Sequence, residues 1–196
     1  MGLILTTPPA AEPLTLAEAK DHLRIGSSDT SDDMIVSALI AAARRWAEEE
    51  LGASIITQTW QLTLSGFPCD SEPIRVPRGP VQSVTSVSYL DSDSQTQTFA
   101  STDYLLEQRL LADEIWLKYL KTWPITVEQR NAVTVVFVAG YGDASTDVPE
   151  DLRRAMLLRL GDLYRNREGQ IVAVTTADNR AMYDLLNAYR RRFSIA

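Results

Sequence analysis

The residue types that most often carry chemistry in proteins are scarce in this sequence. His22 is the only histidine and Cys69 the only cysteine among 196 residues, so the chain cannot form a multi-cysteine or Cys–His zinc site. Cys69 lies in the turn-like sequence Gly-Phe-Pro-Cys-Asp, which favours a spare thiol over a nucleophile. His22 falls in an expected helix, where a surface or packing role is the simpler interpretation. We therefore predict no catalytic residue and no metal site.

The most suggestive carboxylate pair is Asp91-x-Asp93, which resembles the start of a calcium-binding loop. However, Gln95, Thr96 and Thr102 stand where such a loop needs an oxygen ligand of short reach, a glycine and a bidentate glutamate. A hairpin tip explains the pattern better. Glycine-rich phosphate loops and the nucleophile elbow of hydrolases do not occur either. The protein is thus expected to bind no cofactor and not to be an enzyme.

Charge is segregated along the chain, whose net charge is −7. Residues 1–150 carry −11, whereas residues 151–196 carry +4, with nine arginines. An acidic body repels phosphate groups and argues against general nucleic-acid binding by that part of the chain. The basic end suits either DNA or an acidic protein partner, and charge alone does not choose between them. The N-terminal apolar run is too short to span a membrane, and no membrane partner is predicted.

Helices are predicted on both sides of a β-rich middle. Residues 1–13 contain three prolines and are predicted to form an extended arm. Thr15 and Glu18 match a capping box for a helix to about residue 25. Apolar residues at helical spacing predict a second helix over 31–52 that ends at Gly52.

From residue 53 the apolar period changes from helical to alternating, which indicates strands. Strands are predicted near residues 56–64, 81–90 and 96–99, with a hairpin tip at 91–94, and residues 132–138 read as a buried central strand. Helical spacing returns over 149–168 and again over about 179–191.

The fold class is therefore α+β, with a helical core from the N- and C-terminal helices and an inserted β-rich subdomain. The predicted boundaries are 14–52 and 148–168 for the helical core, 53–140 for the insertion, and 169–196 for a loop and a C-terminal helix.

Short segments spread over most of the chain carry a family likeness. They are residues 14–24, 32–43, 80–91, 139–142, 148–155 and 185–190. In this order they resemble the head–tail connector (adaptor) proteins of tailed bacteriophages and of phage-derived gene transfer particles. Ala188 departs from a proline that is common in the family, and residues 92–130 match nothing specific.

This resemblance implies a structural subunit of the virion neck, assembled in the bacterial cytoplasm. Such a subunit works in a ring, expected to be dodecameric, between the portal protein and a head-closure (stopper) or tail protein, and DNA passes through the lumen without specific binding. The alternative function is a nucleic-acid-binding module that uses the Arg-rich C-terminal helix.

Two sets of interaction residues are predicted. Glu48, Glu49 and Glu50 lie at a helix C-terminus, where the helix dipole disfavours anions. They are either simply solvated or face Arg153 and Arg154 of a neighbouring subunit.

The C-terminal segment is predicted to bind the portal through an apolar stripe and a basic cluster. The alternatives are that this helix folds back on its own subunit, or that its arginines bind DNA. The predicted residues are Arg180, Met182, Leu185, Leu186, Tyr189, Arg190, Arg191 and Arg192.

Overall fold

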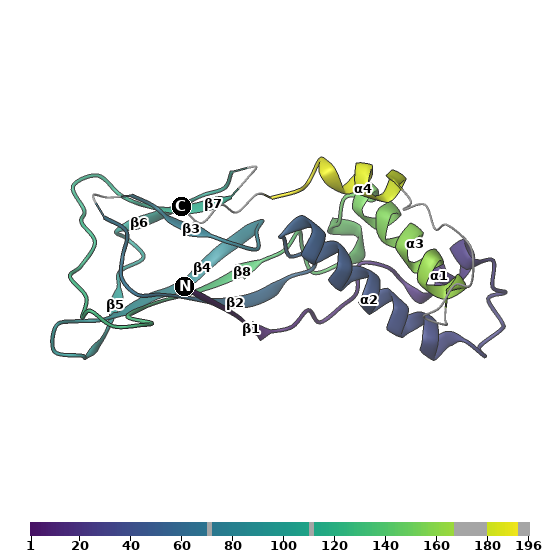
Figure 1. Cartoon of the computed structure of the whole chain (residues 1–196), viewed down its shortest axis with the longest axis horizontal. Coiled ribbons are helices and arrows are strands. Elements are labelled where there is room, and N and C mark those ends of the chain that lie inside the picture. Colours follow the sequence, from purple (N-terminus) through teal and green to yellow (C-terminus); the bar gives the residue numbers. More distant parts are fainter. Residues whose placement is uncertain (70–71, 110–111, 167–179, 192–196) are drawn as a thin grey trace.

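The computed structural model describes residues 1–69, 72–109, 112–166 and 180–191. The chain forms two lobes that lie end to end, one helical and one built from strands (Figure 1). The helical lobe contains α1 (Leu16–Leu23), α2 (Asp33–Leu51), α3 (Glu150–Arg165) and α4 (Arg180–Asn187). The β lobe contains β1 (Gly2–Thr7), β2 (Gln58–Leu64), β3 (Ile74–Val76), β4 (Val81–Leu90), β5 (Thr96–Phe99), β6 (Tyr104–Glu107), β7 (Asp113–Leu117) and β8 (Val133–Ala139). The predicted α+β class is confirmed.

The ends of α1 and α2 follow from local sequence signals. The Thr15 hydroxyl accepts a hydrogen bond from the Glu18 amide, and the Glu18 carboxylate accepts one from the Thr15 amide, so the predicted capping box is present. Gly52 adopts the left-handed conformation with φ 63°, and its N–H bonds to carbonyls of the last turn of α2. A side chain at this position would add strain, which explains the glycine.

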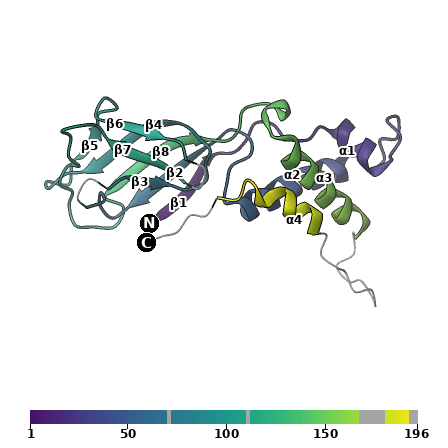
Figure 2. The ribbon, with the colours of Figure 1, turned by 90° about the horizontal axis from the view of Figure 1, so that it is seen from above.

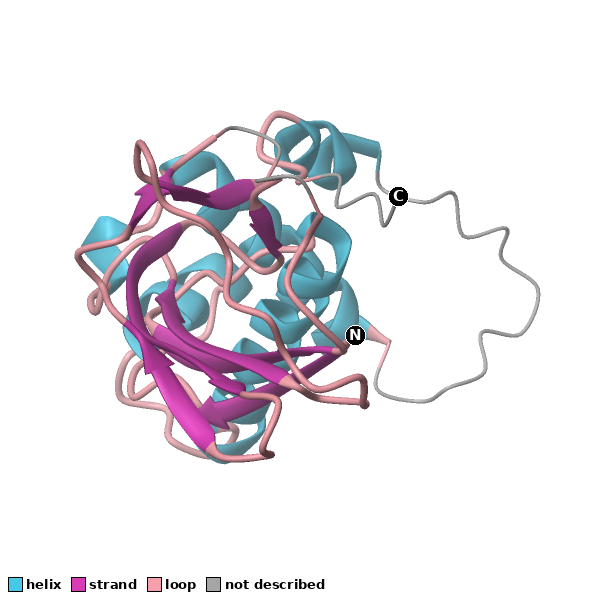
Figure 3. Ribbon diagram, turned by 90° about the vertical axis from the view of Figure 1, so that its left-hand side faces the viewer, coloured by secondary structure: helices cyan, strands magenta, loops and turns pink. Residues whose placement is uncertain are grey.

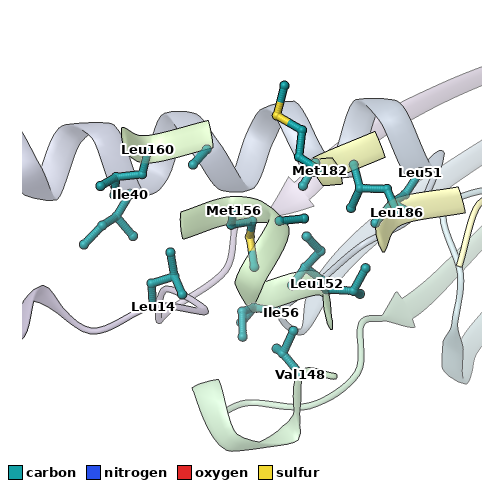
Figure 4. Packing of buried hydrophobic residues seen from close by; sticks show 14 of the residues in the cluster. Leu14, Ile40, Leu51, Ile56, Val148, Leu152, Met156, Leu160, Met182 and Leu186 are labelled. Atoms are coloured by element: carbon teal, nitrogen blue, oxygen red, sulfur yellow. The ribbon is translucent and has the colours of Figure 1, made fainter. Parts of the chain in front are cut away.

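The helical lobe has one hydrophobic core, which joins helices from both ends of the sequence (Figure 4). Leu160 of α3 is fully buried in it, and Leu39 and Trp46 of α2 pack against the same cluster. The prediction that the N-terminal helices and the 149–168 helix share one core is confirmed. The helix α4 lies against α2 and α3 (Figure 2) and contributes Met182 and Leu186, each only 3% exposed.

The β lobe consists of two antiparallel sheets that face each other (Figure 3). The larger sheet has the strand order β1-β2-β8-β4-β5, and the smaller has the order β3-β7-β6. Leu62 and Phe137 of the larger sheet share a buried cluster with Ile74 and Ile115 of the smaller one. The predicted central strand is β8, which pairs with β2 on one side and β4 on the other.

Residues 2–7 of the expected N-terminal arm form β1, which pairs with β2 from Gly2↔Thr63 to Thr7↔Thr59. The hairpin tip is confirmed: the Asp91 carboxylate accepts backbone hydrogen bonds from Asp93 and Gln95. Those bonds close the turn that joins β4 to β5, so the carboxylate already has backbone partners.

We predict that Leu186→Ala lowers the free energy of unfolding by about 2–5 kcal/mol, because it removes buried side-chain atoms and leaves a cavity. Urea unfolding of the full chain would measure the change. Met34→Ala is the matched control, since Met34 is 86% exposed and should shift the value by no more than about 0.5 kcal/mol. Equal effects of the two substitutions would contradict the placement of α4 in the core.

Candidate functional site

The functional residues that the structure brings together lie at the joint between the two lobes. Three segments meet there: the C-terminal turn of α2, the turn before β4, and the chain that follows α4. Charged side chains from all three are paired across the joint. These pairs bear on which of the predicted interaction residues remain available to a partner.

Glu48 stands at the centre of the joint and is only 7% exposed. Its carboxylate accepts hydrogen bonds from the Ile55 amide at 3.1 Å and from the Gln58 side chain, and it pairs with Arg44 at 2.9 Å. Arg44 also binds Glu12 of the segment that leads into α1. Burial raises the pKa of Glu48 above its ordinary value, and the Arg44 charge and the hydrogen bonds only partly oppose this.

Arg78 closes the C-terminal end of α2. Its guanidinium donates to the Glu48 backbone carbonyl at 2.9 Å and to the Glu49 carboxylate at 2.6 Å. It also lies over the ring of Trp60, 5.5 Å from the ring centroid. A cation at this place adds a donor to a carbonyl of the last helical turn and complements the helix dipole. Arg78 thus ties the β lobe to the end of α2.

Asp113 and Arg191 form the most buried ion pair of the joint. Asp113 has no exposed surface, and Arg191 is 13% exposed. The Arg191 guanidinium donates to Asp113 at 2.8 Å, and its backbone N–H donates to the Leu51 carbonyl at 2.9 Å. The Asp113 carboxylate also accepts the amides of Val81 and Arg109. Arg191, in the segment that follows α4, therefore connects the end of α2 with the smaller sheet.

The glutamates of the predicted inter-subunit patch have partners in their own chain. Glu48 is buried as described, with its carboxylate bonded to groups of its own chain, and its contact with a neighbouring subunit stays a prediction. Glu49 pairs with Arg78, and Glu50 pairs with Arg190 at 3.0 Å.

The two arginines proposed as their partners differ. Arg153 binds Glu18 and Glu150 within the chain, whereas Arg154 is exposed. Contact of Glu49, Glu50 and Arg154 with a neighbouring subunit stays a prediction.

The apolar stripe of the C-terminal helix is covered by its own subunit. Met182 and Leu186 are buried in the helical core, and Leu185 and Tyr189 pack against it. In the single chain this packing matches the alternative in which the helix folds back, and portal binding by the stripe stays a prediction.

Of the predicted portal-binding arginines, Arg180 is exposed and Arg192 lies outside the described residues. Arg190 and Arg191 are paired with carboxylates, which weakens the DNA-binding interpretation because their charge is already compensated. Portal contact by Arg180 stays a prediction.

The other residues considered for chemistry have structural surroundings. Cys69 is exposed and unpaired with any other cysteine. His22 is half-buried, and burial lowers its pKa, with Arg154 and Arg165 adding to this effect. Among the described residues, no group of three or more His, Cys, Asp or Glu side chains could hold a metal ion. No helix in this part of the chain is long and apolar enough to cross a membrane.

A pocket of about 610 Å³ opens between α1 and the loop that leads to α2. Its lining includes Leu16, Ile25 and Lys20. The Lys20 ammonium donates to the Asp33 carboxylate at 2.7 Å and to the Asp29 carbonyl at 2.6 Å. These bonds hold the loop between the helices, so Lys20 has a structural role.

The fold and the joint define a structural class: an α+β protein with a helical lobe and a β lobe locked by buried ion pairs. Residues 13–107 match the model of the phage gp6-like head-tail connector protein family. The family resemblance that the sequence predicts is confirmed by this match. The matched region covers α1, α2 and the first part of the β lobe.

Solved structures extend the likeness to the whole chain. The chain is similar to a component of the virion of a native gene transfer agent particle, with a TM-score of 0.80, 22% identity, and coverage of 100% of this chain and 98% of that one. The neck of an empty gene transfer agent particle computed with C6 symmetry gives the same TM-score, identity and coverage. The neck of the native particle computed with C12 symmetry gives a TM-score of 0.73 at the same identity and coverage. At this identity the likeness shows the shared fold. A comparison with curated proteins found no match.

Sequence reasoning missed the residues that hold the joint together. Arg78 and Asp113 lie in the β-rich middle, and each pairs with a residue far away in the sequence. The only local signal was the unfavourable position of Glu48 near the end of α2, which requires a nearby cation. The position of Glu48 predicts a cationic partner, but it does not show whether that cation lies in the same chain or in a neighbouring subunit.

We predict that Arg191→Ala lowers the free energy of unfolding by about 3–5 kcal/mol, because the Asp113 carboxylate would stay buried without a cation. Arg190→Ala is the control: its partly exposed pair with Glu50 should contribute no more than about 1 kcal/mol. Chemical denaturation followed by circular dichroism measures both. If the two variants are equally stable, the buried pair does not hold the joint.

A second prediction concerns the pH dependence of stability. Because folding raises the pKa of Glu48 above its ordinary value of 4.5, the folded chain binds this proton more tightly than the unfolded chain does. Stability from Glu48 is therefore full below pH 4.5 and is lost as the pH rises through the folded pKa. Relative to wild type, Glu48→Gln should become more stable across that interval.

Denaturation of both proteins at a series of pH values would show whether the free energy of unfolding of Glu48→Gln rises relative to that of wild type as the pH increases. Glu49→Gln is the control for the loss of one negative charge, since the Glu49 side chain is 74% exposed. A difference between wild type and Glu48→Gln that stays constant with pH would contradict the assignment.

Proposed function

We propose that this protein is a structural head–tail connector (adaptor) subunit in the neck of a tailed phage or a gene transfer particle. The observation that carries the proposal is the likeness of the whole chain to a neck component of gene transfer agent particles, together with the connector family match. In this function the chain forms a ring between the portal and a head-closure or tail protein, and DNA passes through the lumen.

Self-assembly into a ring is supported by the symmetry named for the similar necks, which were computed with C6 and C12 symmetry. We therefore propose a dodecamer. A ring subunit needs two different contact surfaces, because a head-to-tail contact closes only when unlike surfaces meet. The two-lobed shape in Figure 1 offers such unlike surfaces.

Passage of DNA fits the charge of the protein. The chain carries −7 overall, and the two C-terminal arginines that would be most suited to grip phosphate are paired with Glu50 and Asp113. Like charge suppresses phosphate contacts, so a lumen lined by such subunits lets DNA slide. This feature supports the connector function over the nucleic-acid-binding alternative.

The test uses DNA-filled heads that carry a portal but lack the connector. We expect the purified full chain to co-sediment with these heads and to restore attachment of tails. Heads assembled without portal are the matched control and should not bind the chain. Failure to bind portal-bearing heads, together with salt-dependent binding of free duplex DNA, would replace this proposal with the nucleic-acid-binding function.

A further inference from the structure

The larger sheet of the β lobe ends in two open edges. β1 is its outermost strand on one side, and β5 is outermost on the other, beyond β4. An edge strand has backbone N–H and C=O groups that no neighbouring strand satisfies, so it is a template for pairing with another chain. Proteins usually protect such edges with charges, prolines or bulges.

The edges of the two sheets differ in their protection. The outer strands of the smaller sheet, β3 and β6, each carry a charged residue, Arg75 and Glu107. In contrast, β1 (Gly-Leu-Ile-Leu-Thr-Thr) and β5 (Thr-Gln-Thr-Phe) contain no charged residue and no proline. Ile4 of β1 is 57% exposed, and Leu5 is 40% exposed. Only the larger sheet thus presents uncharged edges, one of which carries exposed apolar side chains.

At the second edge, β5 covers only part of β4 and leaves a stretch of β4 that could pair with another strand. β4 has ten residues, but its register with β5 runs only from Val87↔Phe99 to Leu90↔Thr96. Residues 82–86 of β4 therefore pair with β8 on one side and with no described strand on the other. Gln82, Ser83 and Thr85 are exposed. Its register with β8 shifts between Val81 and Ser83 and again between Val84 and Ser86, and its five residues can accept a short strand such as part of β1.

We infer that β1 of one copy of this chain pairs with the open stretch of β4 in the next copy, so that the larger sheets join around the ring. This inference rests on the proposed function, which supplies identical neighbours. A second copy is the occupant because one chain offers both an uncharged apolar strand and an uncharged stretch of β4. The contact joins unlike surfaces, as ring closure requires.

The strand directions are compatible with this pairing. All neighbours in the larger sheet are antiparallel, so along the order β1-β2-β8-β4-β5 the strand β1 runs opposite to β4. Copies related by rotation about a ring axis that runs along the strands keep these directions. The incoming β1 therefore runs antiparallel to β4, which is the more stable arrangement.

Disulfide trapping on the full chain tests the contact. Cys69→Ser removes the native thiol, and Ile4→Cys is combined in turn with Gln82→Cys, Ser83→Cys and Thr85→Cys. Within one chain β1 and β4 are three strand spacings apart, roughly 14 Å, which is too far for a disulfide. We expect oxidation to give covalent multimers for at least one combination. The matched pair Leu105→Cys and Thr85→Cys should give none, because Leu105 is an exposed apolar residue on the edge of the smaller sheet.

A second measurement uses a charge in place of the apolar side chain. Ile4→Lys should raise the concentration needed for assembly roughly tenfold, because a buried lysine at a strand junction opposes pairing. Leu105→Lys is the control and should leave assembly unchanged. The thermal midpoints of both variants should equal that of wild type, since both side chains are exposed within the subunit.

Both measurements are made on the free chain and on the chain bound to portal-bearing heads. If no combination gives multimers in either setting, or if the two lysine variants assemble alike, the strand pairing is wrong. Binding to heads without cross-linking would overturn this inference and leave the connector function standing. Failure to bind heads would instead contradict the connector function itself.

Discussion

The arrangement of the whole molecule depends on a carboxylate buried at the unfavourable end of a helix. Glu48 lies in the last turn of α2 with almost no exposed surface. An anion there opposes the helix dipole and loses its hydration. The fold compensates by bringing Arg44, the Ile55 amide and Gln58 to its oxygens. Since Gln58 is the first residue of β2, the requirement to satisfy Glu48 fixes where β2 leaves the helical lobe.

The same constraint extends outward from Glu48 in two directions. Arg44 shares its guanidinium with Glu12, which positions the segment before α1. Arg78 binds the Glu48 carbonyl and thereby holds the turn before β4 against the end of α2. The lobes are thus joined by hydrogen-bonded charges as well as by chain connections. In the proposed function such a joint would be useful, because charge pairs with defined geometry hold two lobes at one angle.

The parts of the fold that could be predicted from sequence are those specified by neighbouring residues. The capping box at Thr15, the helix end at Gly52 and the hairpin tip at Asp91 each require only a few adjacent side chains, and all three are present. For β1 the sequence predicts only an extended arm, because the pairing of this strand depends on β2, more than fifty residues away.

The ion pairs of the joint escaped prediction for the same reason. Asp113 and Arg191 are separated by 78 positions, and no local pattern indicates which arginine a buried aspartate will find. The C-terminal stripe of Met182 and Leu186 shows a related ambiguity: an amphipathic helix fits its own core or a partner groove equally well by sequence. In the single chain these residues pack against α2 and α3, which no local pattern could show.

The position of Arg191 also has a consequence for biosynthesis. Asp113 is translated well before its counter-cation, and until residue 191 has emerged from the ribosome the carboxylate has no arginine to accompany it into the interior. While elongation continues, the nascent β lobe therefore lacks this counter-cation, and the Asp113–Arg191 contact forms only as α4 docks. Before that point, the contacts of Arg78 with the end of α2 are available to hold the two lobes together.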